Sequence, residues 1–363
     1  IDVDSFNVQN IWATSVHVIS GSGSAVPSFQ LTNLGTSYNN PVIVLNVQDA
    51  GIDPIDDPGE GGMVWTKSRS AGYSNWLYST EQGTGEGKGL VTNDGTGINL
   101  YSGYNNLSSF NPDGFSLGIS TSGNQSNING NTYASWTFRK AEKFFDIVTY
   151  TGTGSARAVA HNLGSVPGCI IVKRTDTTGD WQVYHRANTA NPETDYLVLN
   201  STAATADSNT RWNDTAPTSS EFTVGTEATV NASGGTYVAY LFAHDAGGFG
   251  DDQSESVIKC GSYTTNSSGV IPTVDLGWEP QWLLLKRTDS TGQWYLYDNM
   301  RGIPTGGNEA TLYPNLFNAE VNGANTIDLL PNGFVGGTDS LSGVTSTYIY
   351  IAIRRGPMKT PED

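Results

Sequence analysis

A fourteen-residue stretch occurs twice in this chain, and it constrains the fold more than any other feature. The segments "IVKRTDTTGDWQVY" (171–184) and "LLKRTDSTGQWYLY" (284–297) are identical at eight positions. Each has an apolar run, a polar turn containing Gly and a second, alternating run, which is the pattern of a β-hairpin. A fainter relative runs from Lys67 to Trp76. The chain is therefore expected to use one β-unit three times.

Several marks recur in the same order in each unit. A Lys ends an apolar run, a Trp follows it after nine, eight and eight residues, and a Phe precedes an aromatic closing strand that begins with Tyr. From the Lys to that Tyr is 66, 64 and 62 residues. We interpret these positions as hairpin architecture and not as a binding site. They are Lys67, Trp76, Phe115, Tyr133, Lys173, Trp181, Phe222, Tyr237, Lys286, Trp294, Phe334 and Tyr348.

The composition favours strands over helices. Gly is abundant at 43 residues, which is typical of many short strands joined by tight turns. The predicted fold is all-β, with three tandem repeats of β-sandwich or jelly-roll-like type. The predicted domains are residues 1–141, a divergent first repeat with an inserted segment; residues 142–250, the second repeat; and residues 251–363, the third repeat with a short C-terminal tail. Each repeat is expected to open with a strand, as "DIVTYTGTGSA" (146–156) does.

The charge of the chain argues against two classes of partner. A net charge of −17 disfavours nucleic acid, because phosphate binding needs a basic surface. No apolar run approaches 18 residues, so insertion into a membrane is not expected. The first residue is Ile1 and not Met, so we expect a processed form, a fragment or the ordered part of a longer polypeptide.

Catalytic motifs are missing from the sequence. His161 and His185 have no counterpart in the third repeat, so we interpret them as tolerated residues. Carboxylates in Gly-rich or Pro-rich loops leave a glycan hydrolase or a Ca²⁺ site open, but solvated turns explain them better. These carboxylates are Asp56, Asp57, Glu60, Asp245, Asp251 and Asp252. The sequence therefore predicts neither an enzyme nor a metal or cofactor.

The cysteines and the remaining tryptophans carry two further hypotheses. Cys169 lies in an apolar run and Cys260 in another expected strand, and a single disulfide between them stays open. Trp12, Trp212 and Trp278 fall outside the repeated positions. Exposed Trp and Tyr rings can bind sugars, so recognition of a host-surface glycan is the strongest hypothesis for binding.

Several longer phrases of the sequence resemble one protein family. They are "SWTFRKAEKFFDIVTYTGTGSARAVAHNLGSVPGCIIVKRTDTTGDWQVYHRA", "YLVLNSTAA", "YVAYLFAHDAGGFGD", "SVIKCGSYTTN" and "IAIRRGPMKTP". The chain from about Gly51 onward resembles repeat-containing virion structural proteins, of tail-fibre-like type, from marine tailed bacteriophages. The resemblance implies a location on the surface of the extracellular virion and a mechanical role, and it supplies no catalytic motif.

The expected function is that of a virion structural protein in a tail fibre or appendage, in contact with host-surface glycans. A capsid-decorating or neck protein without receptor binding is one alternative, and a tail-associated glycan hydrolase is another. The expected partners are other virion proteins and further copies of the chain, a homotrimer by analogy with fibres. Three units in one chain can also form a pseudo-threefold object that needs no partner.

Overall fold

The computed structural model describes residues 13–19, 28–33, 61–98, 107–111, 114–118, 126–250 and 253–355. The chain divides into two compact units, Ile1–Ala50 and Gly51–Asp363. In the first unit, β1 (Ala13–Ile19) pairs antiparallel with β2 (Ser28–Asn33). Only β2 falls in the segment that the sequence marks as inserted in the first repeat, residues 26–48.

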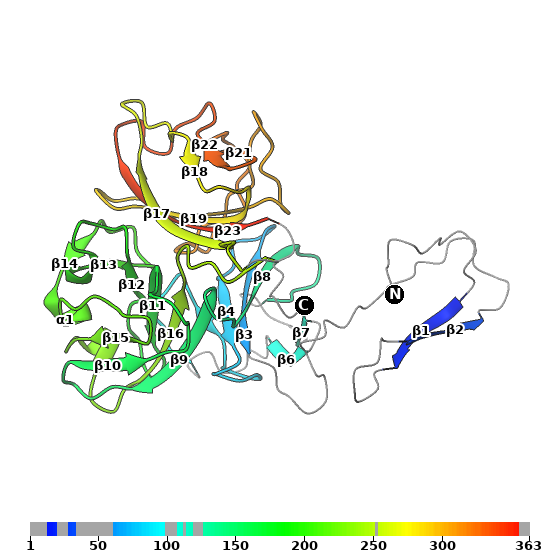
Figure 1. The fold of residues 1–363 in the computed structure, drawn as a ribbon, viewed down its shortest axis with the longest axis horizontal. Coiled ribbons are helices and arrows are strands. Elements are labelled where there is room, and N and C mark those ends of the chain that lie inside the picture. Colours follow the sequence, from blue (N-terminus) through cyan, green and yellow to red (C-terminus); the bar gives the residue numbers. More distant parts are fainter. Residues whose placement is uncertain are drawn as a thin grey trace. The chain divides into compact units, whose positions relative to one another are not determined.

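Three large antiparallel sheets dominate the second unit, coloured blue to cyan, green, and yellow to red in Figure 1. The first sheet has the order β5 (Leu90–Val91), β4 (Trp76–Ser79), β3 (Gly62–Ser68) and β8 (Tyr133–Arg139). The second has the order β14 (Ala206–Asp207), β13 (Asp195–Val198), β12 (Gln182–His185), β11 (Cys169–Arg174), β16 (Thr236–Phe242) and β9 (Phe145–Thr151). The third has the order β17 (Ile258–Thr264), β23 (Thr347–Arg354), β19 (Pro280–Arg287) and β20 (Trp294–Asp298).

A smaller antiparallel sheet accompanies each large one in sequence. These are β6 (Leu107–Asn111) with β7 (Gly114–Leu117), β10 (Arg157–Ala160) with β15 (Glu221–Val224), and β18 (Val274–Asp275) with β22 (Gly333–Val335) and β21 (Asp328–Leu330). Among the described residues the helical segments are single turns: η3 (Pro192–Thr194), α1 (Asn209–Trp212) and α2 (Ala228–Asn231). The prediction of an all-β fold is confirmed, whereas the number of repeats stays a prediction.

The strand that carries the repeated Lys pairs with the closing strand in one register in all three sheets. The opposed residues are Lys67 with Ala134, Lys173 with Val238, and Lys286 with Ile349. In each case the opposed residue directly follows the repeated Tyr. The apolar run before each Lys is buried along its whole length, as expected for a strand with both faces covered.

One hydrophobic core is shared by all three sheets. Phe138 of β8 illustrates this, because its ring packs against rings of both other sheets. The distance between ring centres is 5.7 Å to Phe145 and 5.9 Å to Phe242 of the second sheet, and 5.4 Å to Trp282 of the third. Such aromatic contacts add to the gain from burying the rings. The three sheets therefore cannot lose contact with one another without exposing a common core.

The outer faces of the first and third sheets pack separate clusters against their smaller sheets. The repeated Phe residues lie on the smaller sheets: Phe115 on β7, Phe222 on β15 and Phe334 on β22. Phe222 and Phe334 are buried, and Phe115 is half-buried. Among the described residues, no helix is long and apolar enough to span a membrane.

Candidate functional site

The three repeated lysines are buried, and each binds the backbone of its own hairpin turn. Every Nζ donates to the carbonyl oxygen six residues further along the chain. Lys173 reaches Gly179 at 2.8 Å, Lys286 reaches Gly292 at 2.8 Å, and Lys67 reaches Tyr73. Because lysine is rarely buried without hydrogen-bonding partners, this contact explains why the residue recurs at this position.

Each lysine also donates to a carbonyl in a loop that follows a strand of a different sheet. Lys173 of the second sheet binds Gly95, just after β5 of the first, at 2.7 Å. Lys286 of the third binds Thr202, after β13 of the second, at 3.1 Å. Lys67 of the first binds Phe317, after β20 of the third, at 3.0 Å. The three contacts form a closed cycle, which we call the lysine cycle.

Two of the repeated tryptophans reinforce the lysine cycle. Trp294 pairs opposite Lys286, and the register of β11 with β12 places Trp181 opposite Lys173. The indole Nε1 of Trp181 donates to the Val91 carbonyl at 2.9 Å, and that of Trp294 donates to the Val198 carbonyl at 3.0 Å. Each Trp thus binds the same neighbouring segment as the Lys beside it.

Trp76 does not take the corresponding place in the first sheet. Trp76 follows Lys67 by nine residues, whereas the Trp of the other two units follows its Lys by eight. As a result Trp76 pairs opposite Thr66 and not opposite Lys67. Adjacent residues of a strand point to opposite faces of the sheet, so Trp76 points to the other face and packs into the outer cluster. There it stacks on Tyr78, with the ring centres 6.2 Å apart.

Asn75 stands opposite Lys67 in place of a Trp. Its Nδ2 donates to the carbonyls of Leu316 at 2.7 Å and Tyr313 at 3.1 Å, both in the third sheet's segment that Lys67 also binds. The sequence pattern did not single out Asn75, because the repeated residue is the Trp and not the residue before it. The spacing of nine instead of eight was the signal that could have found it.

Burial sets the protonation behaviour of the lysines. Loss of hydration lowers the pKa of Lys67 to about 7 and the pKa values of Lys173 and Lys286 to about 8. Their partners are neutral carbonyl oxygens, which offset only part of the cost of burying a charge. A perturbed lysine in an open cleft can act as a catalytic base. Here the carbonyls surround the Nζ, so the arrangement is a structural clamp.

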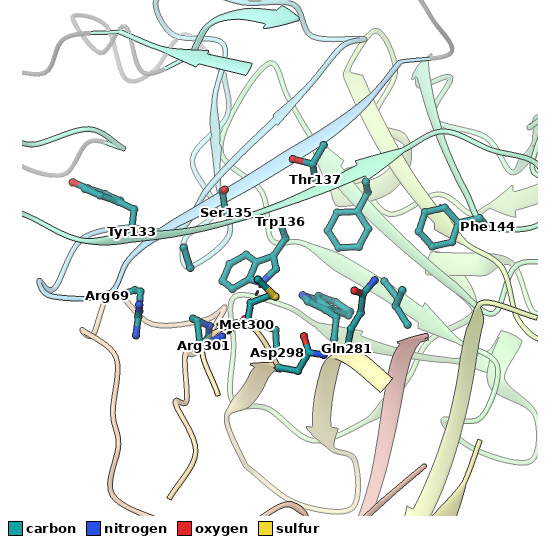
Figure 2. A pocket seen from close by; sticks show the side chains of 15 residues that line it. Arg69, Tyr133, Ser135, Trp136, Thr137, Phe144, Gln281, Asp298, Met300 and Arg301 are labelled. Atoms are coloured by element: carbon teal, nitrogen blue, oxygen red, sulfur yellow. Dashed lines mark hydrogen bonds and ion pairs between the residues drawn. The ribbon is translucent and has the colours of Figure 1, made fainter. Parts of the chain in front are cut away.

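A groove of about 370 Å³ lies beside β8, at the junction of the first and third sheets. We call it the β8 groove. Residues 133–138 line one side, and Gln281, Trp282 and residues 298–301 line the other. Figure 2 shows Trp136 pointing from β8 toward Asp298 and Arg301, and Met300 also lines the groove. Met300 is 90% exposed.

Charged groups fix the aromatic ring in the β8 groove. The Nε1 of Trp136 donates to Asp298 at 2.9 Å, and the Arg301 guanidinium lies 5.4 Å from the Trp136 ring centre. Arg301 also pairs with Asp298 at 2.5 Å and with Glu320 at 3.0 Å. Burial acts to raise the pKa of Glu320, but hydrogen bonds from Arg69 and Arg301 outweigh it and hold that pKa below its ordinary value.

The comparison with protein families places the chain in a family. The model described as "Domain of unknown function (DUF7483)" matches residues 58–357, which is most of the chain. The chain belongs to the DUF7483 family. Neither the curated proteins nor the solved structures contain a match to it.

His161 and His185 of this DUF7483 chain both accept hydrogen bonds from the backbone. His185 is buried, its Nδ1 accepts from the Ala187 N–H at 3.2 Å, and its Nε2 lies 3.0 Å from the Tyr350 carbonyl. Both ring nitrogens are thus engaged in the neutral form. Burial lowers the pKa of His185 to about 3. His161 is also buried, and its Nδ1 accepts from the Leu163 N–H at 3.2 Å.

Those remaining candidates of the DUF7483 chain that the structure describes do not line the β8 groove. Cys169 and Cys260 are buried free thiols. Trp212 is buried and donates to the Asp195 carbonyl, so it offers no surface to a sugar, whereas Trp278 is half-buried. Asp245 pairs with Lys259 at 3.4 Å. The candidates Trp12, Asp56, Asp57, Glu60, Asp251 and Asp252 lie outside the described residues.

Metal chemistry has no visible basis in the part of the chain that the structure describes. No group of three or more His, Cys, Asp or Glu side chains there could hold a metal ion. The described residues form three sheets that the lysine cycle joins, together with the β8 groove, which several aromatic side chains line.

Proposed function

We propose that the chain is a non-enzymatic structural component of a tailed-phage virion, placed in a fibre or another surface appendage. The observation that carries this proposal is the lysine cycle, in which Lys67, Lys173 and Lys286 each bind a different sheet. A body interlocked in this way suits a mechanical building block. The resemblance of the sequence to virion structural proteins supports the location.

The lysine cycle also bears on how copies assemble. Its contacts lie within one chain, which supports a pseudo-threefold body that does not need a homotrimer to bury its core. Association with other virion proteins, or with further copies, would then use the outer surface. The net charge of −17 favours partners that are not themselves strongly acidic.

Contact with host-surface glycans is a second part of the proposal, and the β8 groove is the place that favours it. Trp136 offers a partly exposed aromatic ring, and Arg301 and Asp298 offer polar groups beside it. A hydrolase would need two carboxyl groups about 5–9 Å apart across such a groove, one of them protonated. Asp298 and Glu320 are instead held by arginines, so binding without cleavage is the function proposed.

Imaging of the intact particle tests the proposal. Gold particles attached to a Cys introduced at exposed Met300 should label a fibre or appendage of the virion. Labelling of the capsid shell or neck would favour the capsid-decorating alternative, and unlabelled particles would contradict a structural role. A glycan array probed with the isolated chain, with Trp136→Ala as the matched variant, tests the second part separately.

A further inference from the structure

Two buried polar atoms of the β8 groove have no hydrogen-bond partner among the described residues. They are the indole Nε1 of Trp282 and the side-chain Oδ1 of Asn299, and both residues line the groove. Trp282 is only 4% exposed, so bulk water does not replace the missing bond. A buried polar group without a partner costs free energy. Two such groups in one groove indicate a ligand that supplies their bonds.

The donor and the acceptor come from neighbouring positions on two paired strands. Trp282 of β19 pairs opposite Asp298 of β20. Asn299 directly follows Asp298, and its backbone N–H donates to the Gln281 carbonyl at 3.0 Å. The indole N–H can only donate a hydrogen bond, and the amide oxygen can only accept one. A ligand group that accepts one hydrogen bond and donates another therefore matches the pair.

Apolar side chains surround Trp282 in the groove. The ring of Phe138 meets the Trp282 ring edge to face, with the ring centres 5.4 Å apart. Ile353 of β23 pairs opposite Trp282, and Phe144 lines the same groove. A hydroxyl group would satisfy both polar atoms but would leave these apolar side chains in contact with water. An amide that carries a methyl group satisfies both atoms and also covers the apolar surface.

The charged groups in and beside the groove already pair with one another. Arg301 pairs with Asp298 at 2.5 Å and with Glu320 at 3.0 Å, and Arg69 pairs with Glu320 at 2.8 Å. These two guanidinium groups and two carboxylates together carry no net charge. An acidic or basic sugar would have to compete with these charge-assisted hydrogen bonds, so the groove favours a neutral ligand.

We propose that the β8 groove binds a neutral N-acetylamino sugar through its acetamido group. The acetamido carbonyl accepts from the Trp282 Nε1, and the acetamido N–H donates to the Asn299 Oδ1. The methyl group packs against Phe138 and Ile353, and the half-buried ring of Trp136 contacts the apolar face of the sugar. This inference rests on the proposed contact with glycans, and it names the class of sugar.

Entry of the acetamido group requires movements of side chains only. Asn299 is half-buried and Met300 is 90% exposed, and both line the groove. Exposed side chains change rotamer within nanoseconds. We expect the ligand to reach the two buried atoms by displacing these two side chains, without a change in the backbone.

Two neutral trisaccharides of the same linkage test the inference on the full chain. Chitotriose carries an acetamido group on each sugar where cellotriose carries a hydroxyl group. In titration calorimetry chitotriose should bind at least about tenfold more tightly, because it satisfies both unpaired atoms and covers the apolar surface. Equal affinities would overturn the inference and leave the proposed glycan contact standing. If neither sugar binds, the inference fails, and the proposed glycan contact fails with it only if the glycan array also gives no binding.

The indole N–H of Trp282 gives a direct readout of the assigned bond. Its signal in a two-dimensional proton–nitrogen NMR spectrum is the indole signal that disappears in the Trp282→Phe variant. Chitotriose should move this signal downfield, because the N–H gains an acceptor, and cellotriose should move it less. A signal that bound chitotriose leaves in place would overturn the proposed bond.

Substitution of Asn299 tests the acceptor without changing a fully buried residue. Asn299→Leu keeps a side chain of similar size and removes the carbonyl, so the preference for chitotriose over cellotriose should fall to about twofold. Gln281→Leu changes a second half-buried amide of the groove and should keep the preference, which makes it the matched control. An unchanged preference in Asn299→Leu would overturn the role of Asn299. An N-acetylated peptide that binds as tightly as chitotriose would overturn the assignment to a sugar.

Discussion

The ammonium group of Lys173 lies 2.7 Å from the carbonyl oxygen of Gly95, so a residue of the second sheet binds the backbone of the first. Lys286 and Lys67 make the corresponding bonds from the third sheet to the second and from the first to the third. The Lys of each repeated hairpin thus joins its own sheet to the next, and the three bonds together link all three sheets.

Replacing a clamp lysine should destabilise the chain more than replacing its neighbour. Lys173→Met leaves the carbonyls of Gly95 and Gly179 without this donor, and we expect the free energy of unfolding to fall by about 2–3 kcal/mol. Arg174→Met removes a partly exposed pair with Asp176 and should cost about 1 kcal/mol or less. Urea unfolding measures both, and equal losses would mean that the clamp adds nothing specific.

Stability should rise with pH in the alkaline range. Burial lowers the pKa of Lys67 to about 7 and the pKa values of Lys173 and Lys286 to about 8, against 10.5 for an exposed amine. Between these values and about pH 10.5 the unfolded chain binds more protons, so the free energy of unfolding increases with pH. The slope is at most about 1.4 kcal/mol per pH unit for each lysine.

The measurement belongs between pH 7 and 8.5, because burial raises the pKa values of the Cys169 and Cys260 thiols, which ionise first in the unfolded chain and oppose the trend at higher pH. Above about pH 10 the buried tyrosines oppose the trend, because burial raises the pKa values of Tyr295 and Tyr350 to about 12 and their unfolded forms ionise first. Lys67→Met should flatten the slope from pH 7 upward. A stability that falls over this range in the unchanged chain would show that the lysines stay protonated in the fold.

Stability should also fall in mild acid because of His185. Burial lowers the pKa of His185 to about 3, against 6.5 in an exposed side chain, so the unfolded chain takes up the proton first as the pH drops from 6.5. His185→Gln keeps a donor for the Tyr350 carbonyl without a titrating ring, and its stability should depend less on pH between 6.5 and 4. An unchanged dependence would mean that other groups cause the acid sensitivity, such as the carboxylates or His161 and His244, whose pKa values burial also lowers.

Truncation of Phe138 should weaken all three sheets together. Its ring contacts Phe145, Phe242 and Trp282, so Phe138→Ala should cost about 3–5 kcal/mol in a single unfolding transition. Phe115 lies half-buried in the outer cluster of the first sheet, and Phe115→Ala should cost about 1–2 kcal/mol. A separate transition for the first sheet in the Phe138→Ala variant would show that the core is not shared.

Much of the fold could be predicted from the sequence, because strands leave local patterns. The run before Lys173 and its recurrence before Lys286 predicted buried strands, and the Gly-rich turns excluded long helices. The Phe before each closing strand was a reliable mark as well, since each lies on a smaller sheet. These features depend on neighbours along the chain.

The contacts between sheets could not be predicted, because they join residues far apart in the sequence. Nothing near Lys173 indicates that Gly95 will accept its hydrogen bond, and nothing near Trp136 points to Asp298. The place of Trp76 depended on a single extra residue, which reverses the face of a strand. The β8 groove likewise depends on which strands fail to pair, and a local pattern does not contain that information.

Cleavage of the chain between the second and third sheets tests the lysine cycle most directly. A protease site placed in the loop between Phe242 and Ile258 cuts the covalent link, and sedimentation then reports whether the pieces stay together. The closed cycle predicts that they sediment as one body with the mass of the uncut chain, 38.7 kDa per copy. The double variant Lys67→Met, Lys286→Met, which lacks both clamps on the third sheet, should separate at lower urea concentration. Separation of the cleaved, unsubstituted chain into two free pieces without denaturant would contradict the cycle.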